Sequence, residues 1–412
     1  MKKIFSLILC IAIAITLCGC DIASMFEDFS AKEVFAQFST LEEDVIEEEI
    51  IEEYYEYSPE FDSCYNSLNK KQKKLYNKIY SATEVMPEGF VKLCEQYDGV
   101  IADVNIAYRA VLNDNCEIFW MPDTYLLGKK YKGDKVNICI SFCYSNDEQQ
   151  IDYVVNKEKR DTMRAELDKK AQEIITASSM FNEDFEIVKF LNDYICANTE
   201  YNKEAEFCDT AYGCIVKNQA LCEGYARAFK LLCNLANVEC DLIQGKADGV
   251  GHIWNTVNIN GMYSYVDVTW NDQKEKSYAY LNITEKQLIA DHKIAPLFEE
   301  LSDDEISDGK IFNFIKRDCN SPENSYYVRS GCAFTAENEK KYAEFAAEKI
   351  REKAGQEVYS VGFLLGSENI IKDYEKDNEE FIIKIQQELD DIFINGYSYE
   401  RDVLTLFYEV SD

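Results

Sequence analysis

An Asn-Gly dipeptide, Asn260-Gly261, is the feature of the sequence that most restricts how the chain can fold. Apolar and polar residues alternate before it, over residues 250–259, and again after it, over residues 262–269. This pattern predicts a β-hairpin with a two-residue turn, because Asn and Gly tolerate the positive φ angles that such a turn needs. The turn also fixes the register, so that the numbers of paired residues sum to 521.

That register places a histidine and an aspartate on the same face of the hairpin. Trp254 is expected to pair with Asp267, and His252 with Thr269. His252 and Asp267 are then diagonal neighbours, with backbones about 7–8 Å apart, within reach of an imidazole and a carboxylate. The other face is apolar and is expected to be core; it carries Ile253, Val257, Ile259, Met262, Val266 and Val268.

A helix that opens with a cysteine is predicted before the hairpin. Residues 220–236 are strongly helix-forming, with apolar positions three and four apart, and Asn218 is the expected N-cap. Cys222 falls in the first turn, where unpaired N–H groups and the helix dipole favour a thiolate. Gly224 and Ala226 keep the next turn slim, so that another segment can approach. Cys, His and Asp together suit a thiol nucleophile, its base and the residue that orients the base.

Three short motifs run through this part of the chain. They read C-E-G-Y-A-R-A-F at residues 222–229, H-I-W-N at 252–255 and V-D-V-T-W-N-D at 266–272. In this order and spacing they resemble the transglutaminase-like superfamily, which shares its Cys-His-Asp logic with papain-like enzymes. The resemblance covers about residues 165–290. It implies an α+β core in which Cys222 is the nucleophile, His252 the base and Asp267 the orienter.

Three further residues are candidates for substrate binding. In the superfamily a tyrosine often lies near the cleft at the place of Tyr201, so both a substrate-facing role and a packing role are open. Gln219 invites comparison with a papain-type oxyanion glutamine, although its spacing from Cys222 is shorter than in that family. The backbone N–H of Cys222 is the better expected donor. Trp254 shares the face of His252.

The second histidine, His292, is the competing base. It lies beside Lys293 in a polar stretch without a carboxylate-bearing hairpin, so a solvated or capping role is the favoured interpretation. The sequence has two histidines and no C-x-x-C pair, which disfavours zinc. We expect neither a metal nor a cofactor.

The N-terminus has the pattern of a targeting segment. Lys2 and Lys3 precede an apolar run at residues 4–17, shorter than the ~20 residues of a membrane span. The run ends in Leu17-Cys18-Gly19-Cys20, which resembles a bacterial lipoprotein signal. This resemblance implies export, removal of residues 1–19 and lipidation of Cys20, which would anchor the protein to the outer face of the cell membrane. An ordinary secretory signal or a short anchor is the alternative.

The chain is strongly acidic, with a formal net charge of −33 that becomes about −35 once Lys2 and Lys3 leave with the signal. Such acidity argues against nucleic-acid partners and against charge-driven docking on anionic lipid. Of the 16 cysteines, most are expected to be free, buried thiols, because a chain of 412 residues does not depend on disulfides for a core.

Five segments are predicted along the chain: a signal peptide (1–19), an acidic tether (20–60), an N-terminal α+β domain (61–160), a transglutaminase-like catalytic domain (161–318) and a C-terminal α/β domain (319–412). The fold class as a whole is α+β. Helices are expected over residues 69–80, 158–177, 184–198, 336–354 and 369–392, and further strands over residues 116–121, 136–144, 150–155, 278–283, 324–334, 358–364 and 397–410.

The favoured function is a cell-surface thiol acyl-transfer enzyme that acts on peptide amides through a thioester at Cys222. Water as the acyl acceptor makes it a peptidase or amidase, which we favour, and a lysine amine makes it a cross-linker. Peptides, proteins and cell-wall material are the expected substrates. The alternative is a catalytically silent binding or scaffold protein on the same fold, which a closed cleft around Cys222 would favour.

Overall fold

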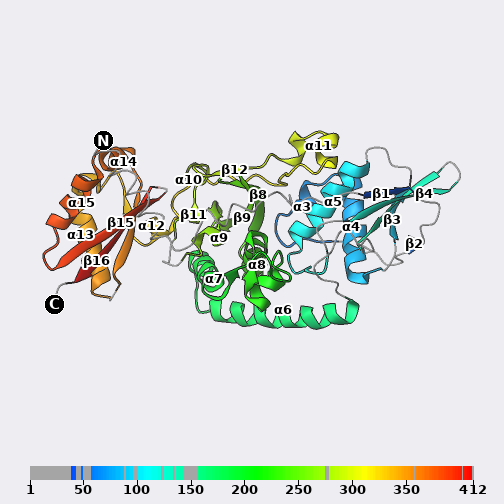
Figure 1. Cartoon of the computed structure of the whole chain (residues 1–412), viewed down its shortest axis with the longest axis horizontal. Helices are drawn as coiled ribbons and strands as arrows, with labels where there is room; N and C mark the ends of the chain where they lie inside the picture. The colour runs from blue at the N-terminus through cyan, green and yellow to red at the C-terminus, as the bar shows by residue number, and fades with distance from the viewer. Residues whose placement is uncertain are drawn as a thin grey trace. The chain divides into compact units, whose positions relative to one another are not determined.

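The computed structural model of the chain (Figure 1) describes residues 39–42, 48–49, 57–87, 90–95, 100–121, 125–132, 135–142, 156–273, 278–356, 358–400 and 402–410. The predicted signal peptide, Cys20, most of the acidic tether and the strand predicted at 150–155 lie outside these residues. The chain divides into two compact units. Unit 1 comprises Met1–Gly261, Val266–Lys276 and Asp291–Arg317, and unit 2 comprises Met262–Tyr265, Ser277–Ala290 and Asp318–Asp412. Both mix helices with strands, so the α+β class is confirmed.

Among its described residues, the first part of unit 1 combines a five-stranded sheet with three helices. The sheet has the order β1-β4-β5-β3-β2. The side chain of Asn69 caps α4 by accepting the backbone N–H groups of Lys71 and Gln72. The elements are α3 (Cys64–Ser67), α4 (Lys70–Val85), α5 (Val100–Asp114), β1 (Ser39–Glu42), β2 (Glu48–Glu49), β3 (Phe90–Glu95), β4 (Leu126–Lys132) and β5 (Lys135–Ser141).

The strand predicted at residues 116–121 is wrong, because this segment is irregular. Its apolar side chains are buried without a strand partner, and that burial explains the strand-like composition. Trp120 donates its indole N–H to the carbonyl of Thr83 at 2.8 Å and lies under the guanidinium of Arg160. Trp120 is therefore part of the core, as the sequence indicated.

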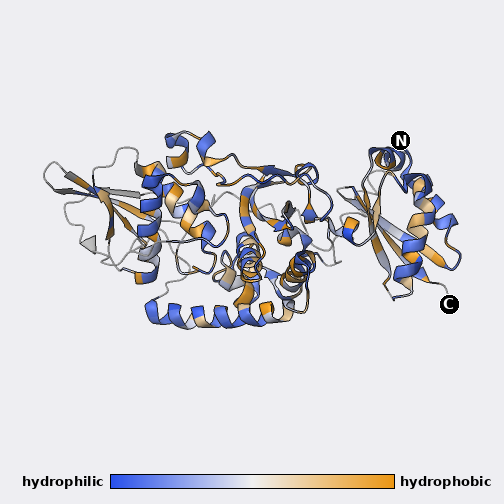
Figure 2. Cartoon of the chain, turned by 180° about the vertical axis from the view of Figure 1, so that it is seen from behind, coloured by the Kyte–Doolittle hydropathy of each residue, from blue (hydrophilic) through white to orange (hydrophobic). Residues whose placement is uncertain are grey.

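The second part of unit 1 packs helices against an antiparallel sheet in which β9, β8 and β12 are neighbours. Helix α7 has the predicted bounds, and α6 begins and ends one residue outside them. One side of α6 is buried and the rest is exposed, which is why the helix is mostly hydrophilic in Figure 2. The elements are α6 (Lys157–Ser178), α7 (Asp184–Asn198), β6 (Glu200–Tyr201), the π-helix η1 (Gly213–Lys217), β7 (Gln219–Ala220), α8 (Cys222–Leu235), β8 (Cys240–Ala247), β9 (Val250–Ile259), α9 (Val268–Asn271), β12 (His292–Ile294), η2 (Phe298–Glu300) and α11 (Asp303–Ser307).

Helix α8 begins later than predicted, and Asn218 is not its N-cap. Residues 219 and 220 form β7, which pairs in parallel with β6, so the helix cannot start before Cys222. Asn218 instead ends η1 in the left-handed conformation, with φ 59°, and Leu221 takes the N-cap position. The slim turn predicted at Gly224 is confirmed, because a Cβ there would lie 2.2 Å from the carbonyl oxygen of Cys208.

A buried ion pair ties α8 to the first part of unit 1. Arg227 donates to Glu223, one turn earlier on α8, at 2.6 and 2.9 Å. Its Nη1 donates to the carbonyl oxygen of Leu112 in α5 at 2.7 Å. Both side chains are less than one-tenth exposed, and these bonds supply the partners that buried charges need.

The predicted turn is confirmed, because Asn260 and Gly261 have φ angles of 55° and 82°. The strand after it is shorter than predicted: β10 (Met262–Val266) ends before Asp267. The side chain of Asp267 accepts the backbone N–H of Trp270 at 3.1 Å and so caps α9. An aspartate at this position favours a helix start over a continued strand.

Unit 2 contains a four-stranded sheet in the order β13-β14-β16-β15, with α13, α14 and α15 against it (Figure 1). The helix predicted at 369–392 is two helices, because Asp377 ends one and caps the next. The strand predicted at 324–334 is mostly wrong, since a short helix and only two strand residues occur there, and the one at 397–410 covers parts of two strands. The elements are β11 (Leu281–Ile283), α10 (Glu285–Leu288), α12 (Tyr326–Arg329), β13 (Ala333–Phe334), η3 (Glu339–Lys341), α13 (Tyr342–Ala354), β14 (Ser360–Leu365), α14 (Glu368–Lys376), α15 (Asn378–Gln387), β15 (Ile392–Glu400) and β16 (Val403–Val410).

Membrane-spanning character was examined for the described helices only, and none of them is both long and apolar enough to cross a bilayer.

Candidate active site

Cys222 is the first residue of α8. Its side chain is 7% exposed and packs in a cluster with Cys116, Ala226, Leu242 and Ile253. The first N–H groups of a helix have no partner within the helix, so the backbone N–H of Cys222 is placed to donate to a developing negative charge. The thiol is therefore held at the electropositive end of a largely buried helix.

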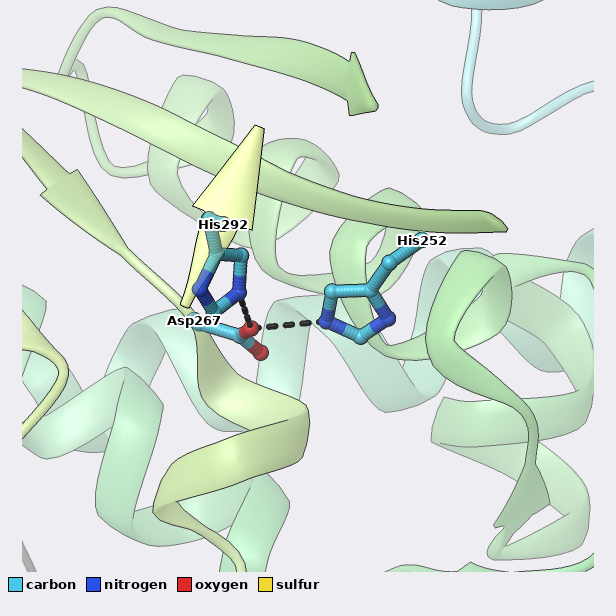
Figure 3. A group of neighbouring side chains, drawn as sticks. All are labelled: His252, Asp267 and His292. Atoms are coloured by element: carbon cyan, nitrogen blue, oxygen red, sulfur yellow. Dashed lines mark hydrogen bonds and ion pairs between the residues drawn. The ribbon is translucent and has the colours of Figure 1, made fainter. Parts of the chain in front are cut away.

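His252 and Asp267 meet as the sequence predicted. Nε2 of His252, from β9, lies 2.7 Å from Oδ2 of Asp267 at the start of α9 (Figure 3). Asp267 is 1% exposed, and its Oδ1 is occupied by the N–H of Trp270. Because Nε2 faces the carboxylate, Nδ1 is the ring nitrogen left for the thiol.

The protonation of the pair follows from opposing effects. Burial by itself would lower the pKa of His252, but the charge and hydrogen bond of Asp267, with a smaller contribution from Cys222, raise that pKa to about 10. Burial by itself would raise the pKa of Asp267, but His252 and His292 hold it below its usual range. At neutral pH the site thus holds an imidazolium beside an ionised carboxylate.

His292 lies in the same cluster, and its predicted solvated or capping role is wrong. The residue is 3% exposed, with Nε2 3.1 Å from Oδ2 of Asp267 (Figure 3). Its Nδ1 is bonded to Oδ1 of Asp291. Both ring nitrogens face carboxylates, so neither is left to take a proton from a thiol. The pairing of β12 with β8 brings the ring here, opposite Ala247.

The three substrate-binding candidates lie in different surroundings. Trp254 is 1% exposed; its ring stacks on His252 and meets His292 edge-on, with centroids 5.9 and 4.9 Å apart. It therefore packs behind the histidines. Tyr201 is partly buried. Its pKa is raised mainly by burial and, second, by the charge of Cys222, so Tyr201 lies near the thiol. Gln219 lies in β7 and is partly buried. Substrate binding by these residues stays a prediction.

His252, Asp267 and His292 are also the described residues that could share a metal ion, with ligand atoms within 4.8 Å of one another. Metal bonds of about 2.0–2.2 Å to these atoms would have to replace both hydrogen bonds to Oδ2. The short His252–Asp267 bond and the contact of His252 with Cys222 fit a catalytic triad better.

Comparison with known proteins gives partial matches. No family model matches the chain. Kyphoscoliosis peptidase of Mus musculus is 31% identical over 109 residues, which is 22% of this chain and 16% of that protein. The Homo sapiens protein of the same name is 32% identical over 107 residues, 21% of this chain and 16% of its own length. A solved structure described as a TGase covers 39% of this chain and 48% of its own, at 15% identity and a TM-score of 0.27.

Proposed function

We propose that this chain, whose core is transglutaminase-like, is a thiol acyl-transfer enzyme that acts on peptide amides. The observation that carries the proposal is the order of contacts around His252. One ring nitrogen is bonded to a buried, ionised carboxylate, and the ring also interacts with the cysteine that opens α8. A thiol nucleophile needs this arrangement of base and orienter.

The first half-reaction forms a thioester. The Cys222 sulfur attacks the amide carbonyl carbon, and the carbonyl oxygen takes up the negative charge near the backbone N–H of Cys222. The His252 imidazolium gives its proton to the amide nitrogen, the C–N bond breaks and the amine leaves. Asp267 holds the ring and remains ionised throughout.

The second half-reaction returns the enzyme to its starting state. Water attacks the thioester carbon while neutral His252 takes a proton from the water. The C–S bond breaks, the carboxylic acid leaves and Cys222 is again a thiolate beside an imidazolium. A substrate amine in place of water yields a new amide, and hydrolysis is the outcome we favour for an exported protein.

The proposal extends to location and partners. Lipidated Cys20 would hold the protein at the outer face of a bacterial membrane, where peptides, proteins and cell-wall material are reachable substrates. The L-C-G-C sequence at residues 17–20 and the net charge of −33, unfavourable for nucleic acid, support it. Incorporation of labelled palmitate into the protein, lost in Cys20→Ala, tests the anchor.

Thiol labelling tests the chemistry. Iodoacetamide, with each labelled cysteine identified by mass spectrometry, should modify Cys222 ahead of the more exposed Cys196 and Cys208. The His252→Ala variant should lose this preference. Labelling in the order of exposure in the unaltered protein would contradict an activated thiol and favour the binding-protein alternative. A peptide library with and without added primary amine, with Cys222→Ala as control, then separates hydrolysis from cross-linking.

A further inference from the structure

The second histidine has no role in the reaction as written, yet its surroundings are as closely fitted as those of the base. His292 bonds to Asp267 through Nε2 and to Asp291 through Nδ1. Its side chain is fully buried, and the edges of Trp254 and Trp270 meet it with ring centroids 4.9 Å away in each case. Apolar surroundings make these two polar bonds strong and costly to lose.

The protons in this cluster can be assigned from donors and acceptors. An ionised carboxylate only accepts hydrogen bonds. Asp267 is ionised and meets three donors: Nε2 of His252, Nε2 of His292 and the backbone N–H of Trp270. Nε2 of His292 therefore carries a hydrogen directed at Oδ2, the same oxygen that His252 uses.

We propose that His292 is a positioning residue, whose Nε2–H fixes Oδ2 of Asp267 toward His252 and keeps that carboxylate ionised in its buried place. Asp291 holds the His292 ring from the other side. This inference rests on the proposed function, because it gives Asp267 the orienting role. The sequence Asp291, His292, Asp267, His252, Cys222 then forms one chain of interactions from a partly exposed carboxylate to the thiol.

Charged groups from several described elements act on this chain of interactions. Cys222 on α8 and Asp267 beside α9 both raise the pKa of His252. The charges of Cys222 and Asp267 also raise the pKa of Tyr201 on β6. Asp291 precedes β12 on the far side of His292. Loss of the His292 donor leaves the buried carboxylate of Asp267 with one fewer stabilising hydrogen bond, so its pKa rises and the imidazolium of His252 loses electrostatic support.

The experiment uses the two histidines themselves. In protein labelled with ¹⁵N-histidine, the imidazole signals come only from His252 and His292, since the sequence has no other. In the unaltered protein, Nε2 of His292 should be protonated. In His292→Leu, His252 should titrate at a lower pH than the value of about 10 in the unaltered protein. The rate of Cys222 alkylation at pH 7 should fall about 10–100-fold, as for other residues that orient a functional ligand.

Matched variants separate positioning from folding. His292→Gln can still offer an N–H to Oδ2 and should keep most of the alkylation rate. Lys293→Gln changes the next residue of β12, whose side chain is exposed, and should behave as the unaltered protein. Equal titration of His252 with and without His292, or an unprotonated Nε2 in the unaltered protein, would overturn the proposal even if no variant folds.

Two other outcomes are distinguishable. A change in the histidine signals of the unaltered protein on adding EDTA would show that the cluster binds a metal, and would also overturn the proposal. If Cys222 of the unaltered protein is no more reactive than Cys196 and Cys208, the proposed function fails, while the His292 measurements still report whether the donor acts on Asp267.

Discussion

The two sides of the His252 ring differ in burial and in the bonds that hold their groups. On the carboxylate side, Asp267 and His292 are at most 3% exposed. Asp267 accepts hydrogen bonds from His252, His292 and the backbone N–H of Trp270. On the thiol side, Cys222 is more exposed and Tyr201 is only partly buried. The carboxylate side thus holds the ring in place, and the thiol side carries the sulfur that the proposed reaction uses.

The largest expected effect comes from the thiol side. Cys222→Ala should remove turnover, by a factor on the order of 10⁶ in kcat, because the proposed thioester forms on that sulfur. Cys116→Ala removes a thiol from the same buried cluster and should leave kcat within a few-fold. Steady-state kinetics on a peptide substrate found by the library measure both. Equal losses in the two variants would show that packing, and not nucleophilicity, explains the first.

The second-largest effect is expected on the carboxylate side of the ring. Asp267→Asn keeps the shape of the side chain but removes the charge, and kcat should fall by roughly 10⁴, as for an aspartate that holds a catalytic histidine in one tautomer. The pKa of His252 should fall from about 10, since the charge of Asp267 is its main cause. Histidine NMR and kcat together check this. If activity is lost while the His252 titration is unchanged, Asp267 acts by orienting the ring and not through its charge.

Stability should also depend on pH through this pair. His252 has a raised pKa, so its contribution is complete below about pH 6.5, its unfolded value, and is lost as the pH rises through about 10. Asp267 has a lowered pKa, so its contribution is present above about pH 3.9 and is lost in acid. Urea unfolding should therefore show a loss on the order of a few kcal/mol between pH 6 and pH 10 that is reduced in His252→Ala.

The smallest expected effect concerns the entry of α8. Gly224→Ala would place a methyl group 2.2 Å from the carbonyl oxygen of Cys208, which must shift, and should cost about 1–3 kcal/mol. Because the shift moves the turn that carries Cys222, kcat should fall as well. Gly355→Ala, where a Cβ meets only ordinary contacts of 3.5 Å, is the control and should change stability by less than about 1 kcal/mol. Chemical denaturation and kcat measure both.

Local signals explain what the sequence predicted correctly. The Asn260-Gly261 turn sets the register over a few residues, so His252 and Asp267 were expected as neighbours, even though the strand ends at Val266, three residues earlier than predicted. Helix α7 is amphipathic, and the spacing of its apolar residues is enough to predict where it begins and ends.

Non-local pairing explains what the sequence missed. Asn218 resembles an N-cap, but the pairing of β7 with β6 delays the helix to Cys222. His292 reaches Asp267 only because β12 pairs with β8, and nothing in the polar residues around it shows this. The short alternation H-K-I at residues 292–294 is a local pattern that could have indicated a strand, but not which strand it pairs with.

The bonds of Arg227 and the packing of Cys116 have a consequence for how such a chain can change over generations. Part of the packing around Cys222 comes from Cys116, about a hundred positions upstream. The guanidinium of Arg227, on the same helix as Cys222, donates a hydrogen bond to a backbone carbonyl of α5. Recombination that moved residues 161–318 alone into another gene would remove one hydrogen-bond acceptor of the buried Arg227 guanidinium and open one side of the thiol. The two parts of unit 1 are thus expected to be inherited as a pair.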